Sequence, residues 1–171
     1  MIILGIDPGS RCTGLGLVRC EGSRLEHLAS QVIRTPEGPF ARRLAHIHTC
    51  LAARLDEWRP ERVALESVFS AKNPRSALQL GQARGVALAL CGLHGLDAAE
   101  YSPSQVKAAV AGFGRAPKEQ VQAMVQRLLS LETAPPQDAA DALAVAICHA
   151  HRASSPGAAR VARAVERELA R

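Results

Sequence analysis

Four acidic residues are placed so that their carboxylates should meet in the folded chain. Asp7 and Glu66 each end a short run of apolar and β-branched residues, so each is expected at the end of a buried strand. Asp138 and Asp141 are three residues apart at the start of an apolar stretch, which puts both on one face near a helix N-terminus. Clustered carboxylates resist joint ionisation, and divalent cations that bind between them relieve this repulsion. The four positions therefore predict a metal site with oxygen ligands only, which favours Mg²⁺ or Mn²⁺ over zinc.

Such a site has the parts needed for phosphodiester hydrolysis. Two metal ions about 3.5–4 Å apart can make a water molecule nucleophilic and stabilise the leaving oxygen. Each acid also has an ordinary structural explanation. Asp7 begins an Asp-Pro-Gly turn, Glu66 can be a solvated strand end, and Asp138 and Asp141 complement a helix dipole. Four acids that converge on one place favour metal binding over four separate explanations.

The charge balance gives a second indication. The chain of 171 residues has a formal net charge of +5, and this charge would rise by four without the four acids. An acidic pocket in a basic protein suits a polyanionic substrate, whose phosphates need both cationic side chains and metal ions. The alternative is an arginine-rich composition that raises the isoelectric point without a role in binding.

Lysine is rare in this chain. Only three of the 21 Lys and Arg residues are lysine, namely Lys72, Lys107 and Lys118. A lysine retained where arginine is the usual cation indicates a need for a compact point charge. Lys107 and Lys118 flank the loop 112–117, which carries Arg115. We expect these four cations to bind DNA, and chance placement is the alternative.

Length and composition predict a single domain. We expect a nuclease domain over residues 1–152 and a flexible basic tail over 153–171, after a Ser-Ser-Pro-Gly linker. The five cysteines form no C-x-x-C pair, so reduced thiols in a cytoplasmic protein are expected. No apolar run is long enough to span a membrane, and Met1 opens directly into a predicted strand without a signal-peptide pattern.

The hydrophobic periodicity predicts an α/β fold. The expected strands cover residues 2–7, 12–20, 24–34, 62–66 and about 97–101. Helices are expected over residues 40–60, from 74 to about 93, from 103 in a short segment, over 117–131, and from about 137. Asn73 is the expected N-cap of the second helix, and Ser102 with Gln105 forms a predicted capping box for the third.

The second of these helices carries an unusual pattern of small residues. Gly81 and Gly85 are four apart, and residues 86–91 are apolar all round. Small residues at this spacing permit close approach of another element. The partner is either the sheet of the same chain or a second copy of the helix in a dimer.

These motifs together resemble one known family. The sequence contains Gly5-Ile6-Asp7-Pro8-Gly9-Ser10 with Thr13-Gly14, then Ala64-Leu65-Glu66-Ser67-Val68-Phe69, Gly81-Gln82-Ala83-Arg84-Gly85 and Asp138-Ala139-Ala140-Asp141-Ala142-Leu143. Over about residues 1–152 this order resembles the bacterial RuvC family of Holliday-junction resolvases. The resemblance implies a ribonuclease-H-like fold, with a five-stranded mixed sheet flanked by helices. It also implies a homodimeric endonuclease that makes paired symmetric nicks in four-way DNA junctions during recombination and repair, and that works with a branch-migration complex.

The resemblance also assigns roles to individual residues. Asp7, Glu66, Asp138 and Asp141 match the catalytic ligands of two Mg²⁺ ions per subunit, for which Mn²⁺ can substitute. Lys107 and Lys118 match basic residues that support DNA binding and cleavage. Phe69 matches an aromatic residue that contacts bases near the junction centre, and Phe113, flanked by glycines, is the rival for that role.

Two other classes of protein share part of the pattern. The opening Gly-Ile-Asp-x-Gly is similar to the phosphate loop of actin-like ATPases and sugar kinases, but those enzymes use two related lobes and this chain has the length of one. A non-catalytic protein that binds junctions would keep the basic surface and lose at least one acid. All four acids are present, so the endonuclease is the preferred interpretation.

Overall fold

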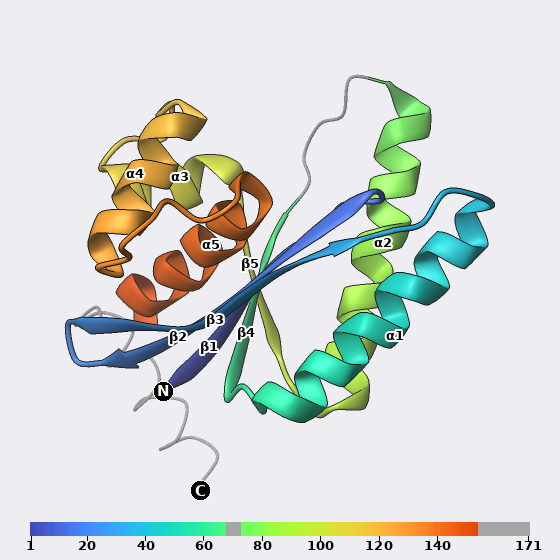
Figure 1. Ribbon diagram of the computed structural model, residues 1–171, viewed down its shortest axis with the longest axis horizontal. Coiled ribbons are helices and arrows are strands. Elements are labelled where there is room, and N and C mark those ends of the chain that lie inside the picture. The colour runs from blue at the N-terminus through green and yellow to red at the C-terminus, as the bar shows by residue number, and fades with distance from the viewer. Residues whose placement is uncertain (68–72, 154–171) are drawn as a thin grey trace, which may run out of the picture.

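The computed structural model describes residues 1–67 and 73–153, which form one mixed sheet with helices on both faces (Figure 1). The five-stranded sheet has the order β3-β2-β1-β4-β5. Its strands are β1 (Ile2–Asp7), β2 (Cys12–Glu21), β3 (Arg24–Arg34), β4 (Arg62–Glu66) and β5 (Ala98–Tyr101). The first three pair antiparallel, whereas β4 and β5 run parallel to β1. This is the ribonuclease-H-like arrangement that the sequence predicts.

The helices divide between the two faces of the sheet. They are α1 (Phe40–Trp58), α2 (Pro74–Leu93), α3 (Pro103–Ala111), α4 (Lys118–Leu128) and α5 (Gln137–Ala153). Figure 1 shows α1 and α2 on one side and α3, α4 and α5 on the other. Alternating side chains of β1 separate accordingly, because Leu4 and Ile6 lie in the core with α1 and α2 whereas Ile3 lies in the core with α5.

Helix α5 packs close to the sheet because three glycines of the sheet face it. A Cβ atom at Gly5 would lie 2.1 Å from the Ala142 carbonyl oxygen, and one at Gly14 would lie 1.9 Å from the Asp138 carbonyl oxygen. At Gly16 the nearest atom would be the Leu143 backbone nitrogen, at 2.7 Å. Any side chain here would push the helix away, so these glycines fix where the N-terminal half of α5 lies.

The predicted caps are confirmed. The Asn73 side chain accepts a hydrogen bond from the Ser76 backbone N–H at 2.8 Å, and Ser102 forms the capping box with Gln105. The predicted extent of the fourth helix, 117–131, is too long. The helix ends at Leu128 because Ser130 takes a left-handed conformation with φ 51°, which breaks the helical path.

Gly81 and Gly85 do not pack on the sheet. A Cβ atom at either position would meet no atom within 4 Å, so the interpretation that these glycines allow close packing within the chain is wrong. Ala83 and Arg84 of α2 face the rest of the chain instead. Ala83 is fully buried, and Arg84 forms an ion pair with Glu100 of β5. The glycine face of α2 is left open to solvent.

Two sequence predictions lie partly outside this description. The domain boundary at residue 152 and the basic tail over 153–171 stay predictions, because the described part of the chain ends at Ala153. No helix in residues 1–67 and 73–153 is both long and apolar enough to cross a membrane.

Candidate active site

Two of the four predicted acids end adjacent parallel strands. Ile6 of β1 pairs with Leu65 of β4, so Asp7 and Glu66 follow at the same edge of the sheet. On its other side Asp7 pairs with Gly14 of β2. The central position of β1 between β4 and β2 therefore brings Asp7 to the middle of this edge.

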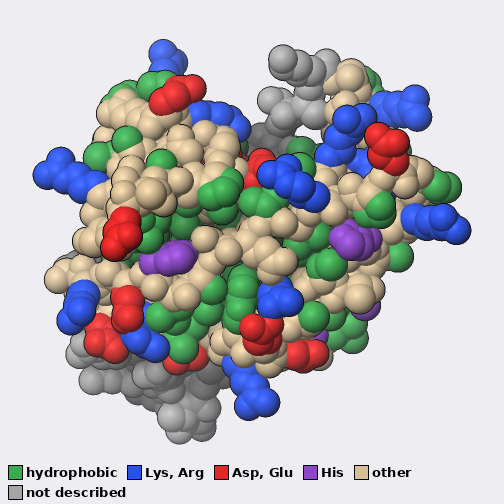
Figure 2. Space-filling view, in the orientation of Figure 1, with side chains coloured by type: hydrophobic (Ala, Val, Ile, Leu, Met, Phe, Trp, Pro, Cys, Tyr) green, Lys and Arg blue, Asp and Glu red, His purple; other side chains and the backbone are tan. Residues whose placement is uncertain are grey.

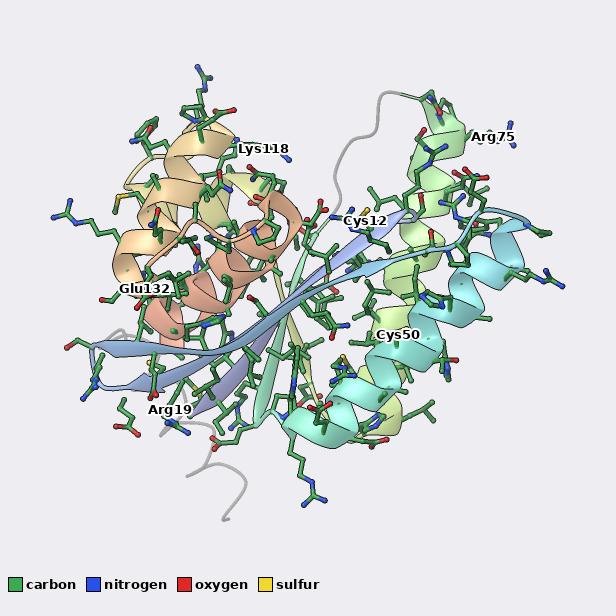
Figure 3. The ribbon with its side chains drawn as sticks, in the orientation of Figure 1. Cys12, Arg19, Cys50, Arg75, Lys118 and Glu132 are labelled. Carbon is green, nitrogen blue, oxygen red and sulfur yellow. The ribbon has the colours of Figure 1, made fainter. Side chains whose placement is uncertain are left out.

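The other two acids come from the first two turns of α5. Asp138 and Asp141 line the same pocket as Asp7 and Glu66, with Lys107 of α3 and Lys118 of α4. This pocket, of about 450 Å³, is called the carboxylate pocket below. Figure 3 labels two side chains that line it, Lys118 at the start of α4 and Cys12 at the start of β2. The convergence of all four acids, expected from spacing alone, is thus present.

Burial and mutual repulsion alter the acids at the sheet edge. Burial raises the pKa of Asp7 well above its usual value, and the charges of Glu66 and Asp141 raise it further. Burial also raises the pKa of Glu66, although a hydrogen bond from Asp7 acts in the opposite direction. Burial and the neighbouring carboxylates therefore oppose joint ionisation of Asp7 and Glu66. The pocket has more negative charge than its own cations neutralise.

Asp141 is held by a cation and an amide. Its Oδ2 atom lies 3.3 Å from the Lys118 ammonium nitrogen, and its Oδ1 atom accepts a hydrogen bond from the Gln137 side chain at 3.0 Å. The Asp141 carboxylate raises the pKa of Lys118, so this lysine is charged. The side chain of Lys118 is 64% exposed, which leaves it able to exchange Asp141 for another anion.

The turn after Asp7 is clamped by a buried threonine. The Thr13 hydroxyl donates to the Gly9 carbonyl oxygen at 3.0 Å and accepts from the Gly9 N–H at 3.3 Å. Thr13 is 1% exposed, and a Cβ atom at Gly9 would lie only 2.0 Å from the Cys12 carbonyl oxygen. The buried Thr13 hydroxyl therefore holds the backbone of the turn that follows Asp7. The turn can take this path only because Gly9 has no side chain.

The donor set suits a hard divalent cation, because it consists of carboxylate oxygens in a pocket with excess negative charge. In the described residues, however, no three acidic, histidine or cysteine side chains lie in an arrangement that would enclose an ion. Lys118 and Gln137 contact the two oxygens of Asp141. A metal ion that binds Asp141 would have to displace the Lys118 ammonium group.

The remaining predicted site residues differ in their placement. Lys107 is half-buried in the carboxylate pocket. Arg115 is exposed in the loop between α3 and α4 and is not among the residues that line the pocket. Phe113 is 48% exposed in the same loop. Phe69 and Lys72 lie outside the described residues, so their predicted roles stay predictions.

Two residues of this site were not predicted from the sequence. Gln137 precedes Asp141 by four positions, a spacing at which helical side chains meet, so the contact was open to prediction. Thr13 belongs to the motif that suggested the family, but its clamp on Gly9 depends on the bend of the turn and on burial. Neither property can be read from residue types alone.

The sequence comparisons agree with one another. The sequence profile of a family described as "Crossover junction endodeoxyribonuclease RuvC" matches residues 3–149. A protein of that description from Marinobacter nauticus is 58% identical over 150 residues, which cover 88% of this chain and 86% of the relative. Another from Alkalilimnicola ehrlichii is 52% identical over 151 residues, covering 88% and 92% of the two chains.

Solved structures extend the similarity to the fold. A structure of Thermus thermophilus RuvC in complex with a Holliday junction substrate superposes with a TM-score of 0.84 at 39% identity, covering 90% of this chain and 95% of that one. The yeast mitochondrial Holliday junction resolvase Ydc2 shares the fold at 14% identity, with a TM-score of 0.63 over 86% of this chain and 77% of that one. With nearly its whole described length matched in sequence and in structure, this chain belongs to the RuvC family of crossover junction endodeoxyribonucleases.

Proposed function

We propose that this chain is a structure-specific endonuclease that resolves Holliday junctions in homologous recombination and DNA repair. The observation that carries the proposal is the carboxylate pocket, where acids from β1, β4 and α5 meet two lysines in a chain of this family. The T. thermophilus relative, which is 39% identical, is solved with its junction substrate. The reaction is hydrolysis of a phosphodiester in each of two strands, placed symmetrically across the junction.

We further propose that Asp7, Glu66, Asp138 and Asp141 are the catalytic residues and hold two Mg²⁺ ions per subunit, with Mn²⁺ as a substitute. The family is metal-dependent, and the oxygen donors of the pocket suit these ions. Bound there, the ions supply a nucleophilic water and stabilise the leaving oxygen. The pKa values of Asp7 and Glu66 are raised, and two divalent cations in the pocket would favour the ionised form of both residues.

The two lysines act on the substrate phosphate. Lys118 is exposed and charged, so it can leave Asp141 and contact a phosphate that enters the pocket. Lys107 faces the same pocket from α3. Cations placed where charge develops on the transferred phosphate lower the barrier to cleavage. Lys72, Arg115 and Phe69 are proposed as further DNA contacts on the strength of the sequence.

Paired nicks require two active sites, and α2 offers the surface for a homodimer. One face of α2 is exposed along the whole helix and carries small or apolar residues: Leu78, Gly81, Gly85, Ala89, Gly92 and Leu93. Leu78 and Leu93 are 64% and 78% exposed, and with the small residues between them they form an exposed stripe of apolar and small residues, which can mark an interaction surface. Positions three, four and seven apart fall on one helical stripe, and the glycines permit two copies of α2 to approach closely. We also propose a branch-migration complex as partner and a cytoplasmic location, both on the strength of the family.

The deciding experiment compares a synthetic four-way junction with linear duplex of the same sequence, in Mg²⁺ and in EDTA. Symmetric nicks in the junction alone, and only with metal, are expected. The Asp7→Asn variant should lose cleavage by about 10³-fold or more, since loss of a metal contact removes several kcal/mol of transition-state stabilisation. Junction binding should persist or strengthen, because a carboxylate that repels phosphate is gone. Cleavage of duplex at the junction rate, or normal nicking by Asp7→Asn, would contradict the proposal.

A further inference from the structure

A second pocket lies beside the carboxylate pocket and is rich in arginine. It has a volume of about 490 Å³ and is called the arginine pocket here. Arg11 comes from the turn after β1, Arg34 from the last position of β3, and Arg43 from the first turn of α1. Glu37 is the one acidic residue that lines it. Figure 2 shows Lys and Arg side chains over the part of the surface where α1 begins.

The positive charge of this pocket is not neutralised within the described chain. None of the three arginines forms an ion pair with a carboxylate of residues 1–67 or 73–153. Arg11 and Arg34 are exposed, and Arg34 has a single weak contact, 3.6 Å from its Nη1 atom to the Cys12 sulfur. Three guanidinium groups and one carboxylate leave this pocket with a net positive charge, which suits an anion.

Arg43 forms the rigid side of the pocket. Its guanidinium group donates to the Ser10 carbonyl oxygen and, through Nε, to the Thr35 hydroxyl at 3.3 Å. The same group lies over the Phe40 ring, 5.4 Å from its centroid. Arg43 is thus a structural residue, and Arg11 and Arg34 are the two cations able to reach a ligand.

The arginine pocket is fixed relative to the carboxylates. Cys12 lines both pockets, so they adjoin. The Thr35 N–H donates to the Arg11 carbonyl oxygen at 2.9 Å, which ties the end of β3 to the turn that follows Asp7. A strand of DNA whose scissile phosphate lies at Asp7 would therefore pass next to Arg11 and Arg34.

We infer that the arginine pocket binds a second, uncleaved phosphodiester of the DNA strand that is cut in the carboxylate pocket. The planar guanidinium fork matches two oxygens of a phosphate, so the exposed forks of Arg11 and Arg34 suit a phosphate better than a neutral ligand. Contacts to phosphates position nucleic acid without reading its sequence. Occupation of this site sets which phosphate of the strand lies at the carboxylates. The inference rests on the proposed function, and it adds a separate binding site to it.

A phosphate-neutralisation scan tests this directly. Single methylphosphonate linkages, which remove one backbone charge each, are placed in turn along the strand that is cleaved in a four-way junction. Binding is measured by fluorescence anisotropy in EDTA, where no cleavage occurs, for the wild type and for Arg34→Gln and Arg11→Gln. The control is Arg24→Gln, because Arg24 is also an exposed arginine of β3 but stands at the opposite end of that strand.

The wild type should lose affinity at the scissile linkage and at one further linkage close to it. Arg34→Gln and Arg11→Gln should bind the unmodified junction about tenfold more weakly, as expected for one charge-assisted hydrogen bond, and should be insensitive to that further linkage. The slope of log K against log salt should become shallower by about 0.9 for each phosphate that the variant no longer neutralises. Arg24→Gln should match the wild type in all three measurements.

The outcomes separate the two proposals. If the wild type cleaves junctions but both variants keep its affinity, salt slope and scan pattern, the arginine pocket is not a phosphate site and the nuclease function stands. If only one variant behaves as expected and both melt at the wild-type temperature, the site uses that arginine alone and the inference of a shared site is overturned. If the wild type neither prefers nor cleaves junctions, both proposals are wrong.

Discussion

The backbone of Asp138 lies directly against Gly14, whose missing side chain leaves room for it. A Cβ atom at Gly14 would be 1.9 Å from the Asp138 carbonyl oxygen. Gly14 is also the residue that pairs with Asp7 across the β1–β2 ladder. One glycine therefore sets the distance between the acid at the sheet edge and the acids of α5.

Replacement of this glycine should damage the site before it unfolds the protein. Gly14→Ala forces the first turn of α5 outward, and such overpacking costs about 1–3 kcal/mol of stability. We expect a lower melting temperature and a cleavage rate reduced at least tenfold, because displacement of catalytic groups by about 1 Å is costly. Circular dichroism shows whether the variant is folded. A variant with wild-type cleavage would mean that α5 tolerates the shift and that Gly14 does not set the geometry of the pocket.

The acids of the carboxylate pocket should make stability depend on pH in a metal-free protein. The pKa values of Asp7 and Glu66 are raised in the folded state, so the folded protein binds more protons than the unfolded chain. The contribution of these two residues to stability is therefore full below the ordinary carboxyl range, and it is lost as pH rises through the raised values. In EDTA we expect the melting temperature to fall from pH 5 towards pH 8, and to fall less in Asp7→Asn.

Mg²⁺ should reverse this loss. Ions that bind the ionised carboxylates of the folded state add about 2.7 kcal/mol at a concentration of 100 times the dissociation constant. The rise in melting temperature should be larger at pH 8 than at pH 5, where protons compete for the ligands. Thermal melts with and without millimolar Mg²⁺, with Asp7→Asn as the control, measure the effect. No rise at pH 8 would count against a metal site in this pocket.

Much of the site could be predicted from the sequence, because strand ends and helix starts have local signals. Asp7 and Glu66 each end an apolar run. Asn73 is a favourable N-cap residue, and it is followed by proline at the first helical position. The end of α4 was predicted too late in the chain because Ser130 has a left-handed backbone conformation, and serine does not signal such a conformation in the sequence.

The arginine pocket had no such signal. Arg11, Arg34 and Arg43 share no local sequence motif and come from the turn after β1, the end of β3 and the start of α1. They meet only because Thr35 and Ser10 connect the end of β3, the turn after β1 and the start of α1. Neither hydrophobic periodicity nor local motifs can predict a site that is assembled by tertiary contacts between loops.

Lys118 should matter more for the rate of cleavage than for binding. Lys118→Ala removes a cation that neutralises Asp141 and can contact the transferred phosphate, so we expect a rate about 10²-fold lower with a smaller loss of affinity. Lys107→Ala should act in the same direction. The control is Arg163→Ala in the predicted basic tail, which should lower affinity at most and leave the cleavage rate at saturating protein unchanged. Single-turnover cleavage at saturating protein separates the two effects, and equal losses in affinity with no loss in this rate would make both lysines ordinary docking residues.

The open face of α2 should hold two copies of the chain together. Leu93→Glu or Gly85→Glu places a charge in the proposed interface, so both variants should be monomers at concentrations where the wild type is a dimer. Light scattering after gel filtration gives the mass directly. Ala45→Glu on the exposed face of α1 is the matched control. A wild-type protein that is monomeric at micromolar concentration, or variants that remain dimeric, would rule out this interface.

Phe69 and Phe113 are the two candidates for an aromatic residue that contacts bases at the junction centre, where bases are easily unstacked. Phe113 is 48% exposed and is flanked by Gly112, which has a left-handed φ of 86°, whereas Phe69 follows Glu66 by three residues and lies outside the described residues. An aromatic ring stacked on a base contributes about 1–3 kcal/mol. From the sequence we expect Phe69 to be the wedge, because it closely follows Glu66, a proposed metal ligand. Phe69→Ala should bind junctions, unstack their centre less and cut them more slowly, and Phe69→Trp should stay active.

Fluorescence of 2-aminopurine at the junction centre reports the unstacking. Unchanged fluorescence with Phe69→Ala would remove Phe69 from this role, and loss of the signal in Phe113→Ala would assign the role to the loop between α3 and α4.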